Sequence, residues 1–227
     1  MSWDLYWRKA VEPERRGLYQ MIAEFYRDQI ISRSAAVILS RHFVDSEERH
    51  YLHAGCGSGG SDRRIALGRS HFHFLDLSPM AIQLHRKQPV RLRRSYVCGD
   101  IFRLPYASGS LDGIFNFGVM EHFTEPQISA ILSEFKRVLK TNGCMILFWP
   151  PDFGLSVLLL GSFLKVVNCF RAQPLKLYPD EISRIHSFRW IRNLMQQNAF
   201  RVLRIEFGPR DLFTNVSVVA EKAEGVP

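Results

Sequence analysis

The sequence is poor in cysteine, and none of its cysteines is paired in a metal or redox motif. The four lie far apart, at Cys56, Cys98, Cys144 and Cys169. This spacing excludes a zinc ribbon or a dithiol motif and argues against a disulfide framework. We therefore expect buried, reduced thiols in a cytoplasmic protein. The N-terminus lacks the charged start and apolar core of a secretory signal peptide, so we expect no such signal.

Acidic residues are fewer than basic ones, which gives the chain of 227 residues a formal net charge of +8. Much of the excess lies in two clusters, residues 63–69 and 86–94. Such clusters are either solvated helix faces or surfaces that attract nucleic acid, anionic lipid or phosphorylated substrates. Aromatic residues do not alternate with these arginines, as they would in a single-strand binder. We do not expect nucleic acid as the partner. An RNA substrate is kept as the alternative, because the positive charge supports it.

Glycines at every second position form the most informative motif of the chain. Residues 51–60 read YLHAGCGSGG, in which Gly55, Gly57 and Gly59 follow a short apolar run. Glycine permits a positive φ and lets bare backbone approach a ligand. A strand, a glycine turn and a helix start are how an open α/β sheet holds a nucleotide-like cofactor. Alone the motif is weak, because glycine-rich turns without a ligand are common.

Two acids follow the motif at distances that suit a nucleotide. Asp76 ends the apolar run 72–76 and stands 21 positions after Gly55, close to the roughly 20 expected of a ribose-binding acid. Asp100 follows a further short apolar run, 24 positions on. A carboxylate at the first position can accept both ribose hydroxyls, and one at the second can accept from the exocyclic amine of a base. The alternative for Asp76 is a solvated loop residue.

A fourth segment, residues 109–122, is an apolar strand with a glycine-containing exit and a final Glu121-His122 pair. In this order the four segments resemble the class I S-adenosylmethionine-dependent methyltransferases. The resemblance is greatest to the methyltransferase type 11 group, which includes the methyltransferases of ubiquinone and menaquinone biosynthesis. It extends from about residue 51 to residue 149. Each motif is weak alone, whereas the set is highly specific.

The resemblance implies an S-adenosylmethionine cofactor and assigns residues to it. The glycine segment would hold the methionine part, Asp76 the ribose, and Asp100 with Ile101 the adenine, while Asn116 would lie near the sulfur. The full set of expected cofactor-binding residues is His53, Gly55, Cys56, Gly57, Gly59, Asp76, Leu77, Asp100, Ile101 and Asn116.

The chain departs from the family pattern at two positions. The family often has an acid two positions before the first glycine, where this chain has His53. A neutral imidazole can accept or donate a hydrogen bond near the sulfonium or the carboxylate of the cofactor, or it can simply orient the loop. Some quinone O-methyltransferases bind a divalent metal through an acid three positions before the Glu of the Glu-His pair. This chain has Gly118 there, and we predict no metal site.

Methyl transfer asks little of the protein, because a sulfonium methyl is already activated and the transfer is an in-line displacement. A base is needed where the acceptor starts protonated, and His122 is the best candidate because free imidazole titrates near neutral pH. Glu121 could orient His122 or bind the acceptor, and the alternative for the pair is a structural helix start. The aromatic character of Tyr6 and Trp7 suits either of them to close the mouth of the site.

Two missing motifs narrow the choice of acceptor. Amine methyltransferases that act on nucleobases or glutamine tend to carry Asn/Asp-Pro-Pro-aromatic after the fourth strand, where residues 116–119 read NFGV. No cysteine follows Pro150 or Pro151, as methylation of cytosine C5 would need. We expect transfer to an oxygen or carbon of a small-molecule or lipid-like acceptor. The alternative outside enzymes is a catalytically silent protein of this fold that binds a partner.

Strands and helices alternate along the chain, which predicts a doubly wound α/β sheet with helices on both faces. The resemblance makes it Rossmann-like and seven-stranded, mostly parallel with an antiparallel last strand. We expect strands at 49–54, 72–76, 94–98, 112–117 and 144–149, helices at 17–43, 60–68, 79–87 and 125–140, and hairpin strands at 200–207 and 214–221. We interpret the chain as one domain with an N-terminal helical cap (1–45), a cofactor-binding core (46–150), a variable lid or substrate-binding insertion (151–199) and terminal hairpin strands (200–222).

Residues 155–170 are nearly all apolar but too few to span a bilayer, which takes about 20 residues. Three interpretations are open: a core helix on the sheet, a lid or pocket wall for an apolar substrate, and an interfacial helix with peripheral membrane contact. The last two favour a lipid-like, quinone-like or lipid-linked acceptor. A capped helix start is expected at residues 178–182, because Pro179 suits a first helical turn.

Overall fold

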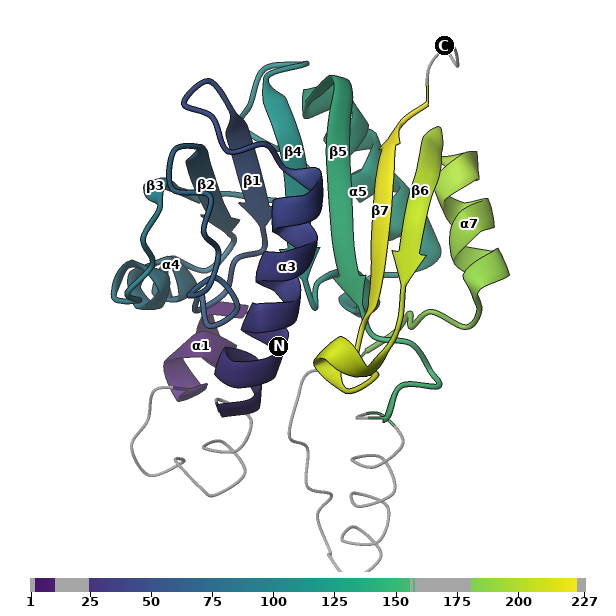
Figure 1. Cartoon of the computed structure of the whole chain (residues 1–227), viewed down its shortest axis with the longest axis horizontal. Coiled ribbons are helices and arrows are strands. Elements are labelled where there is room, and N and C mark those ends of the chain that lie inside the picture. The colour runs from purple at the N-terminus through teal and green to yellow at the C-terminus, as the bar shows by residue number, and fades with distance from the viewer. Residues whose placement is uncertain (1–2, 11–24, 156, 158–180, 224–227) are drawn as a thin grey trace, which may run out of the picture.

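Seven strands form one sheet in the order β3-β2-β1-β4-β5-β7-β6 in the computed structural model, which describes residues 3–10, 25–155, 157 and 181–223 (Figure 1). The strands are β1 (His50–Ala54), β2 (His71–Asp76), β3 (Arg93–Cys98), β4 (Leu111–Phe117), β5 (Leu139–Trp149), β6 (Phe200–Glu206) and β7 (Val216–Lys222). Strands β1 to β5 pair in parallel, and β7 runs antiparallel to β5 and β6. The predicted fold class is confirmed, including the antiparallel last strand.

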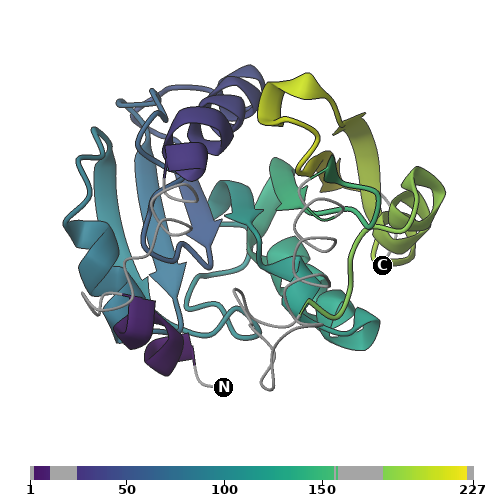
Figure 2. The same ribbon diagram turned by 90° about the horizontal axis from the view of Figure 1, so that it is seen from below.

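Helices cover both faces of the sheet (Figures 1 and 2). Helices α3 (Ser32–His42) and α4 (Pro79–Arg86) pack on one face, and α5 (Glu125–Val138) and α7 (Phe188–Gln197) pack on the other. Near the carboxyl ends of the parallel strands lie α1 (Trp3–Ala10) and the short π-helix η2 (Arg27–Ile31). Two short 3-10 helices, η3 (Met120–His122) and η4 (Pro209–Asp211), follow β4 and β6.

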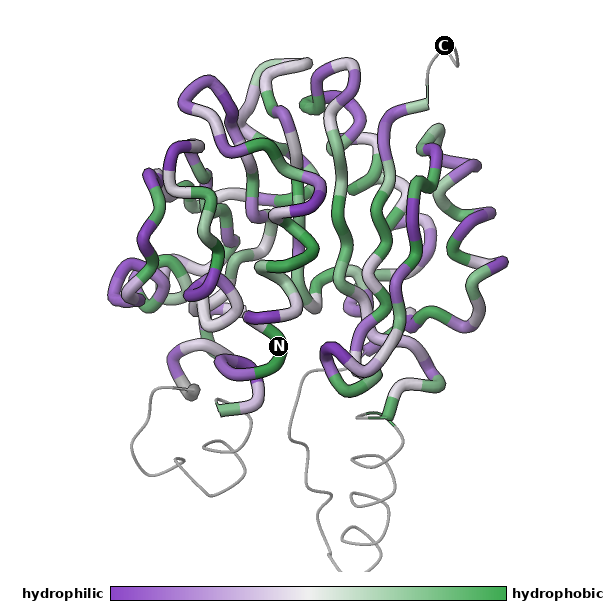
Figure 3. Tube along the Cα trace, in the orientation of Figure 1, coloured by the Kyte–Doolittle hydropathy of each residue, from purple (hydrophilic) through white to green (hydrophobic). Residues whose placement is uncertain are grey.

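The two faces of the sheet bury two separate cores. Successive residues of a strand point to opposite faces, so Ile114 joins the core under α5 and α7, while Phe115 joins the core under α3 and α4. Figure 3 shows that strands β5 and β7 are largely apolar, whereas α7 is polar on its outer side.

Local signals explain where the helices near the site begin. The Ser78 hydroxyl caps α4 by accepting a hydrogen bond from Ala81 N, and Pro79 takes the first helical position. Helix α5 begins with a capping box between Thr124 and Gln127. Both helices therefore start directly after the ends of β2 and β4, where a cofactor site is expected.

The predicted helix at residues 60–68 is wrong. The chain makes successive turns there, closed by hydrogen bonds from Asp62 N to Gly59 O at 3.2 Å and from Ile65 N to Asp62 O at 3.1 Å. Gly59 has a φ of +75°, which no α-helix accommodates, and the Asp62 side chain is fully buried against two histidines. These constraints hold the segment as an ordered loop.

Other predicted bounds differ from the structure or lie outside the described residues. The fifth strand begins at Leu139, earlier than the predicted residue 144. Of the predicted helix 17–43, the described part forms η2 and α3. Most of 155–170 and residues 178–180 are not described, and the segment Glu181–Arg184 is not helical. The domain boundaries stay a prediction. None of the helices in the described ranges is long and apolar enough to cross a membrane.

Candidate active site

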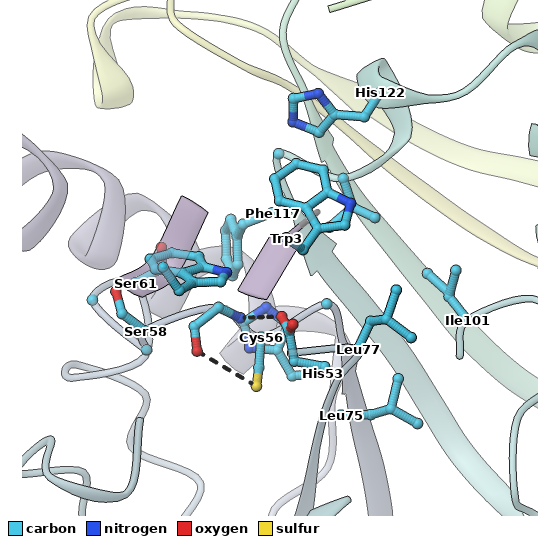
Figure 4. Close-up of a pocket in the computed structure, with 18 of the residues that line it drawn as sticks. Trp3, His53, Cys56, Ser58, Ser61, Leu75, Leu77, Ile101, Phe117 and His122 are labelled. Carbon is cyan, nitrogen blue, oxygen red and sulfur yellow. Dashed lines mark hydrogen bonds between the residues drawn. The ribbon is translucent and has the colours of Figure 1, made fainter. Parts of the chain in front are cut away.

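A cavity of about 520 Å³ opens at the carboxyl ends of β1, β2 and β4 (Figure 4). Its size suits a small-molecule ligand, and β1 and β4 flank the point where the order of the strands reverses, the usual ligand site of an open α/β sheet. Its walls are residues 55–61, 75–77, 99–102, 117–119 and 214–215, together with side chains of α1, η2 and η3.

The glycine segment forms a loop of bare backbone at the floor of the cavity. Gly55, Gly57 and Gly59 have φ values of +75°, +52° and +75°, so each uses the left-handed region that favours glycine. The loop is tied to the end of β2, because the N–H groups of Gly55 and Cys56 both donate to Leu75 O, at 2.8 and 2.9 Å. The predicted cofactor residues Gly55, Cys56, Gly57 and Gly59 therefore all line the cavity.

Asp76 links this loop to the end of β2. Its carboxylate accepts hydrogen bonds from Gly57 N and Ser78 N, both at 2.9 Å, and its side chain lines the cavity. Asp76 is 8% exposed, and burial raises its pKa above the ordinary range. Because a carboxylate has about four acceptor positions, lone pairs remain for ligand hydroxyls after these two bonds.

The adenine-side residues lie on the opposite wall. Asp100 and Ile101 both line the cavity, and Asp100 accepts a hydrogen bond from Phe102 N at 3.0 Å. Ile101 is buried, whereas Leu77 is exposed at the rim. The wall thus offers apolar surface beside an exposed carboxylate, which suits a flat heterocycle with an amine.

Two predicted residues do not line the cavity. Asn116 is fully buried, and neither its amide nitrogen nor its amide oxygen has a partner in the part of the chain that the structure describes. Because neighbours on a strand point to opposite faces, Phe117 borders the cavity where Asn116 was expected. Glu121 is also buried and absent from the lining.

Glu121 is held as a neutral carboxyl by its surroundings. Burial raises its pKa from 4.5 to about 8, and the nearby Glu181 adds to the rise. Its Oε2 has no hydrogen-bond partner among the residues described, while its backbone carbonyl accepts from Ile182 N and Ser183 N. At neutral pH the Glu121 side chain is therefore a protonated carboxyl that can donate a proton, and not a carboxylate that orients His122.

His122 faces an aromatic wall made by α1. Its ring lies edge-on to Trp3 with centroids 4.9 Å apart, and Trp3, Tyr6 and Trp7 form a chain of edge-on contacts (Figure 4). All four side chains line the cavity. The candidate base therefore lies beside aromatic side chains, whereas the cofactor loop is polar backbone.

Helix α1 is anchored to the core through Asp4. Its carboxylate accepts from the Ser78 hydroxyl at 2.9 Å and from Met80 N at 3.3 Å, at the start of α4. The Arg8 guanidinium, which donates to Asp4 at 2.7 Å, is the first cause of its lowered pKa. Sequence reasoning singled out Tyr6 and Trp7 but missed Trp3 and this anchor, because a contact across more than 70 positions has no local signal.

A buried histidine–aspartate–histidine triad underlies the glycine loop. Asp62 Oδ2 lies 3.0 Å from His53 Nδ1 and 2.8 Å from His85 Nε2, and all three side chains are at most 2% exposed. Burial alone would raise the pKa of Asp62, but the two histidines bring it below its ordinary value. His53 borders the cavity. Sequence reasoning missed Asp62 and His85.

The triad is also the group within the described ranges whose ligand atoms are close enough to hold a metal, within 4.8 Å of one another. A metal-bound histidine usually donates its other ring N–H to a partner. Here His53 Nε2 and His85 Nδ1 have no such partner within the described part of the chain. The distances and the partnerless nitrogens suit a hydrogen-bonded triad better than a metal centre, and the expected absence of a metal stays a prediction.

One cation, Arg27, stands among the described residues that line the cavity. Its side chain passes beside Gly60, where an added Cβ would meet Arg27 Cδ at 3.0 Å. The π-helix η2 places Arg27 and Ile31 on the same side, toward the cavity. Arg27 is therefore positioned to meet an anionic group of a ligand bound on the glycine loop.

Comparison with known proteins identifies the domain. Residues 52–143 match the family model described as a methyltransferase domain. The chain is 32% identical to a malonyl-[acyl-carrier protein] O-methyltransferase of Laribacter hongkongensis, over 41% of this chain and 34% of that protein. It is 31% identical to a malonyl-[acyl-carrier protein] O-methyltransferase of Legionella pneumophila, over 43% of this chain and 35% of that protein. The chain thus spans about a third of the length of the curated relatives it matches.

Among solved structures, magnesium protoporphyrin IX methyltransferase from Synechocystis with bound S-adenosylhomocysteine has a TM-score of 0.66 and 16% identity, covering 96% of this chain and 93% of that one. This likeness concerns the fold. The bare glycine loop, the buried Asp76 and the Asp100–Ile101 wall fit S-adenosylmethionine as the cofactor. Sheet order, the family match over residues 52–143 and the relatives together support a class I S-adenosylmethionine-dependent methyltransferase of the type 11/25 group.

Proposed function

We propose that the protein transfers a methyl group from S-adenosylmethionine to an oxygen, or to a carbon, of a small-molecule or lipid-like acceptor. The observation that carries the proposal is the division of the cavity. One part is polar backbone with Asp76 and Asp100, and another part is the aromatic surface around His122, to which Trp3 of α1 contributes. A polar part suits the cofactor, and an aromatic part suits an apolar acceptor.

The cofactor supplies an activated methyl group, and the chain supplies position and shelter. The glycine loop and Asp76 fix one reactant, and the aromatic wall of Trp3, Tyr6 and Trp7 excludes water from the other. Holding two reactants in line can contribute several kcal/mol to the lowering of the barrier. His122 is placed to take a proton from an acceptor hydroxyl.

The names of the curated relatives support oxygen as the target atom. Both are described as malonyl-[acyl-carrier protein] O-methyltransferases. An acceptor that already carries a carboxylate needs no base, so in that case His122 would contact the acceptor without moving a proton. Peripheral membrane contact through residues 155–170 stays a proposal, since most of that segment lies outside the described residues.

The test is methyl transfer from S-adenosylmethionine labelled in the methyl group. The purified protein is incubated with quinol-like, lipid, fatty-acyl and glycan fractions and, separately, with RNA. We expect label in an apolar or acyl fraction, none in RNA, and none with the Asp76→Ala variant. Label in RNA alone would replace this proposal with an RNA substrate. Cofactor binding without transfer to any fraction would favour a catalytically silent protein.

A further inference from the structure

The triad of His53, Asp62 and His85 contains a buried carboxylate with no cationic lysine or arginine beside it among the described residues. Asp62 is 0% exposed, and within the described ranges its carboxylate contacts the two imidazoles through Oδ2, while Oδ1 has no partner. A buried ionised group without a counter-charge is costly. The fold therefore keeps a negative charge under the cofactor loop at a cost in stability, which calls for a compensating role.

The triad fixes the tautomer of His53. Two imidazole nitrogens approach the same oxygen of Asp62, and the lowered pKa of Asp62 keeps that oxygen an acceptor. His53 therefore carries its proton on Nδ1, which donates to Asp62, and Nε2 holds a lone pair. That Nε2 is buried and has no partner among the described residues, and His53 borders the cavity. The lone pair on His53 Nε2 therefore lacks a hydrogen-bond donor, which a bound ligand would supply.

The methionine end of the cofactor carries one ammonium and one carboxylate group. The cavity offers one matching group for each: Arg27 beside Gly60 for the carboxylate, and the lone pair of His53 for the ammonium. The aromatic rings around His53 hold it in place, with Phe115 stacked at 4.4 Å and Phe117 edge-on at 5.5 Å. These two partners thus fix how the amino acid end of the cofactor is oriented in the cavity, with its carboxylate toward Arg27 and its ammonium toward His53.

We propose that Asp62 is a positioning residue of the cofactor site, which acts through His53 to place a negative charge opposite the ammonium group of the bound cofactor. The inference rests on the proposed function, since it requires that this cavity bind S-adenosylmethionine. The proposal also explains why a histidine can stand at position 53, where the family often has an acid. The negative charge comes here from Asp62, which is linked to the cofactor through one further hydrogen bond, to His53. His85 holds Asp62 from the other side.

A different role would be purely structural. The triad packs directly below the loop, since a Cβ on Gly59 would lie 2.7 to 2.8 Å from the His85 ring. Removing Asp62 could then loosen the loop and weaken every ligand equally. A ligand pair separates the two roles. S-adenosylhomocysteine carries the amino acid end, whereas methylthioadenosine keeps the nucleoside and the sulfur but lacks the ammonium and the carboxylate.

The experiment is calorimetric titration of both ligands into the full chain, as wild type, Asp62→Asn and the double variant His53→Glu/Asp62→Asn. Losing one charge-assisted hydrogen bond corresponds to about a 10- to 100-fold loss of affinity. We expect Asp62→Asn to lose about that factor for S-adenosylhomocysteine and to bind methylthioadenosine within about twofold of wild type. The double variant, which moves the carboxylate to position 53, should regain most of the lost affinity.

Equal losses for both ligands in Asp62→Asn would overturn the proposal in favour of a structural role. A wild-type preference for S-adenosylhomocysteine that a chelator abolishes would replace it with a metal site. If Asp62→Asn does not fold, the wild type still decides: a deaminated analogue of S-adenosylhomocysteine must bind at least about tenfold more weakly than the parent, and equal binding refutes the proposal. Absence of any binding to wild type would instead refute the proposed function.

Discussion

The buried Glu121 makes a specific prediction about how stability depends on pH. Its side chain is 4% exposed, and burial raises its pKa from 4.5 to about 8. Below pH 4.5 the carboxyl is neutral in the folded and the unfolded chain. Between pH 4.5 and 8 the unfolded chain loses this proton while the folded chain keeps it. Stability therefore falls as pH rises through this window, and the loss is complete above pH 8.

The size of the effect follows from the change in pKa. A rise from 4.5 to about 8, at about 1.4 kcal/mol per pH unit, gives about 5 kcal/mol as the ceiling. Glutamine has nearly the shape of a protonated glutamate and cannot ionise. The Glu121→Gln variant should therefore match wild type near pH 5 and exceed it by about 2 to 5 kcal/mol at pH 9.

The assay is urea unfolding of both proteins at pH 5, 7 and 9, followed by circular dichroism. Glu125→Gln is the matched control, because Glu125 is an exposed carboxylate one turn away that accepts from Trp190 Nε1, a bond that glutamine can keep. Its difference from wild type should stay within a few tenths of a kcal/mol at each pH. A Glu121→Gln difference that does not change from pH 5 to 9 would refute the reasoning, since Glu121 would then ionise as freely in the folded chain as in the unfolded one.

Two further substitutions test the cavity. Gly57→Ala forces a side chain into the left-handed region and against Trp7, whose Cζ2 would lie 2.8 Å away, whereas Gly109→Ala meets the same backbone cost with nothing within 4 Å. Both variants should lose about 1 to 2 kcal/mol of stability. Only Gly57→Ala should also weaken the binding of S-adenosylhomocysteine, at least about tenfold, as measured by calorimetry. Equal binding of S-adenosylhomocysteine by the two variants would count against α1 as a wall of the site. His122→Ala should lower kcat by about 10²- to 10⁴-fold on a hydroxyl acceptor and leave cofactor affinity unchanged; full turnover in steady-state assays would remove its role as base.

Much of the cofactor half could be predicted because its signals are local. The spacing from Gly55 to Asp76 is set by one strand–loop–strand unit, and hydrogen bonds from Gly55 N and Cys56 N to Leu75 O and from Gly57 N to Asp76 join the loop to the end of β2. Strand alternation with helices likewise fixes the parallel part of the sheet. These features depend on residues within about 25 positions of one another.

The rest depends on loop conformation, on contacts between distant segments and on strand register. The triad was missed because residues 60–68 were predicted as a helix, whereas the loop that they form brings Asp62 between His53 and His85. Burial of Glu121 needs residues 182–183, whose N–H groups donate to its carbonyl. Asn116 was placed in the cavity because the register of its strand does not follow from composition, and one position decides which face a side chain takes.

The most direct test of the account is calorimetric titration of wild type and Asp76→Ala with S-adenosylmethionine and S-adenosylhomocysteine. Asp45→Ala is the control, because Asp45 also ties down a loop, through Arg69 N and Ser70 N, but does not border the cavity. The account predicts saturable binding of both ligands to wild type and Asp45→Ala, and a loss of at least about tenfold in Asp76→Ala. No binding to folded wild type, or equal binding to Asp76→Ala, would contradict it.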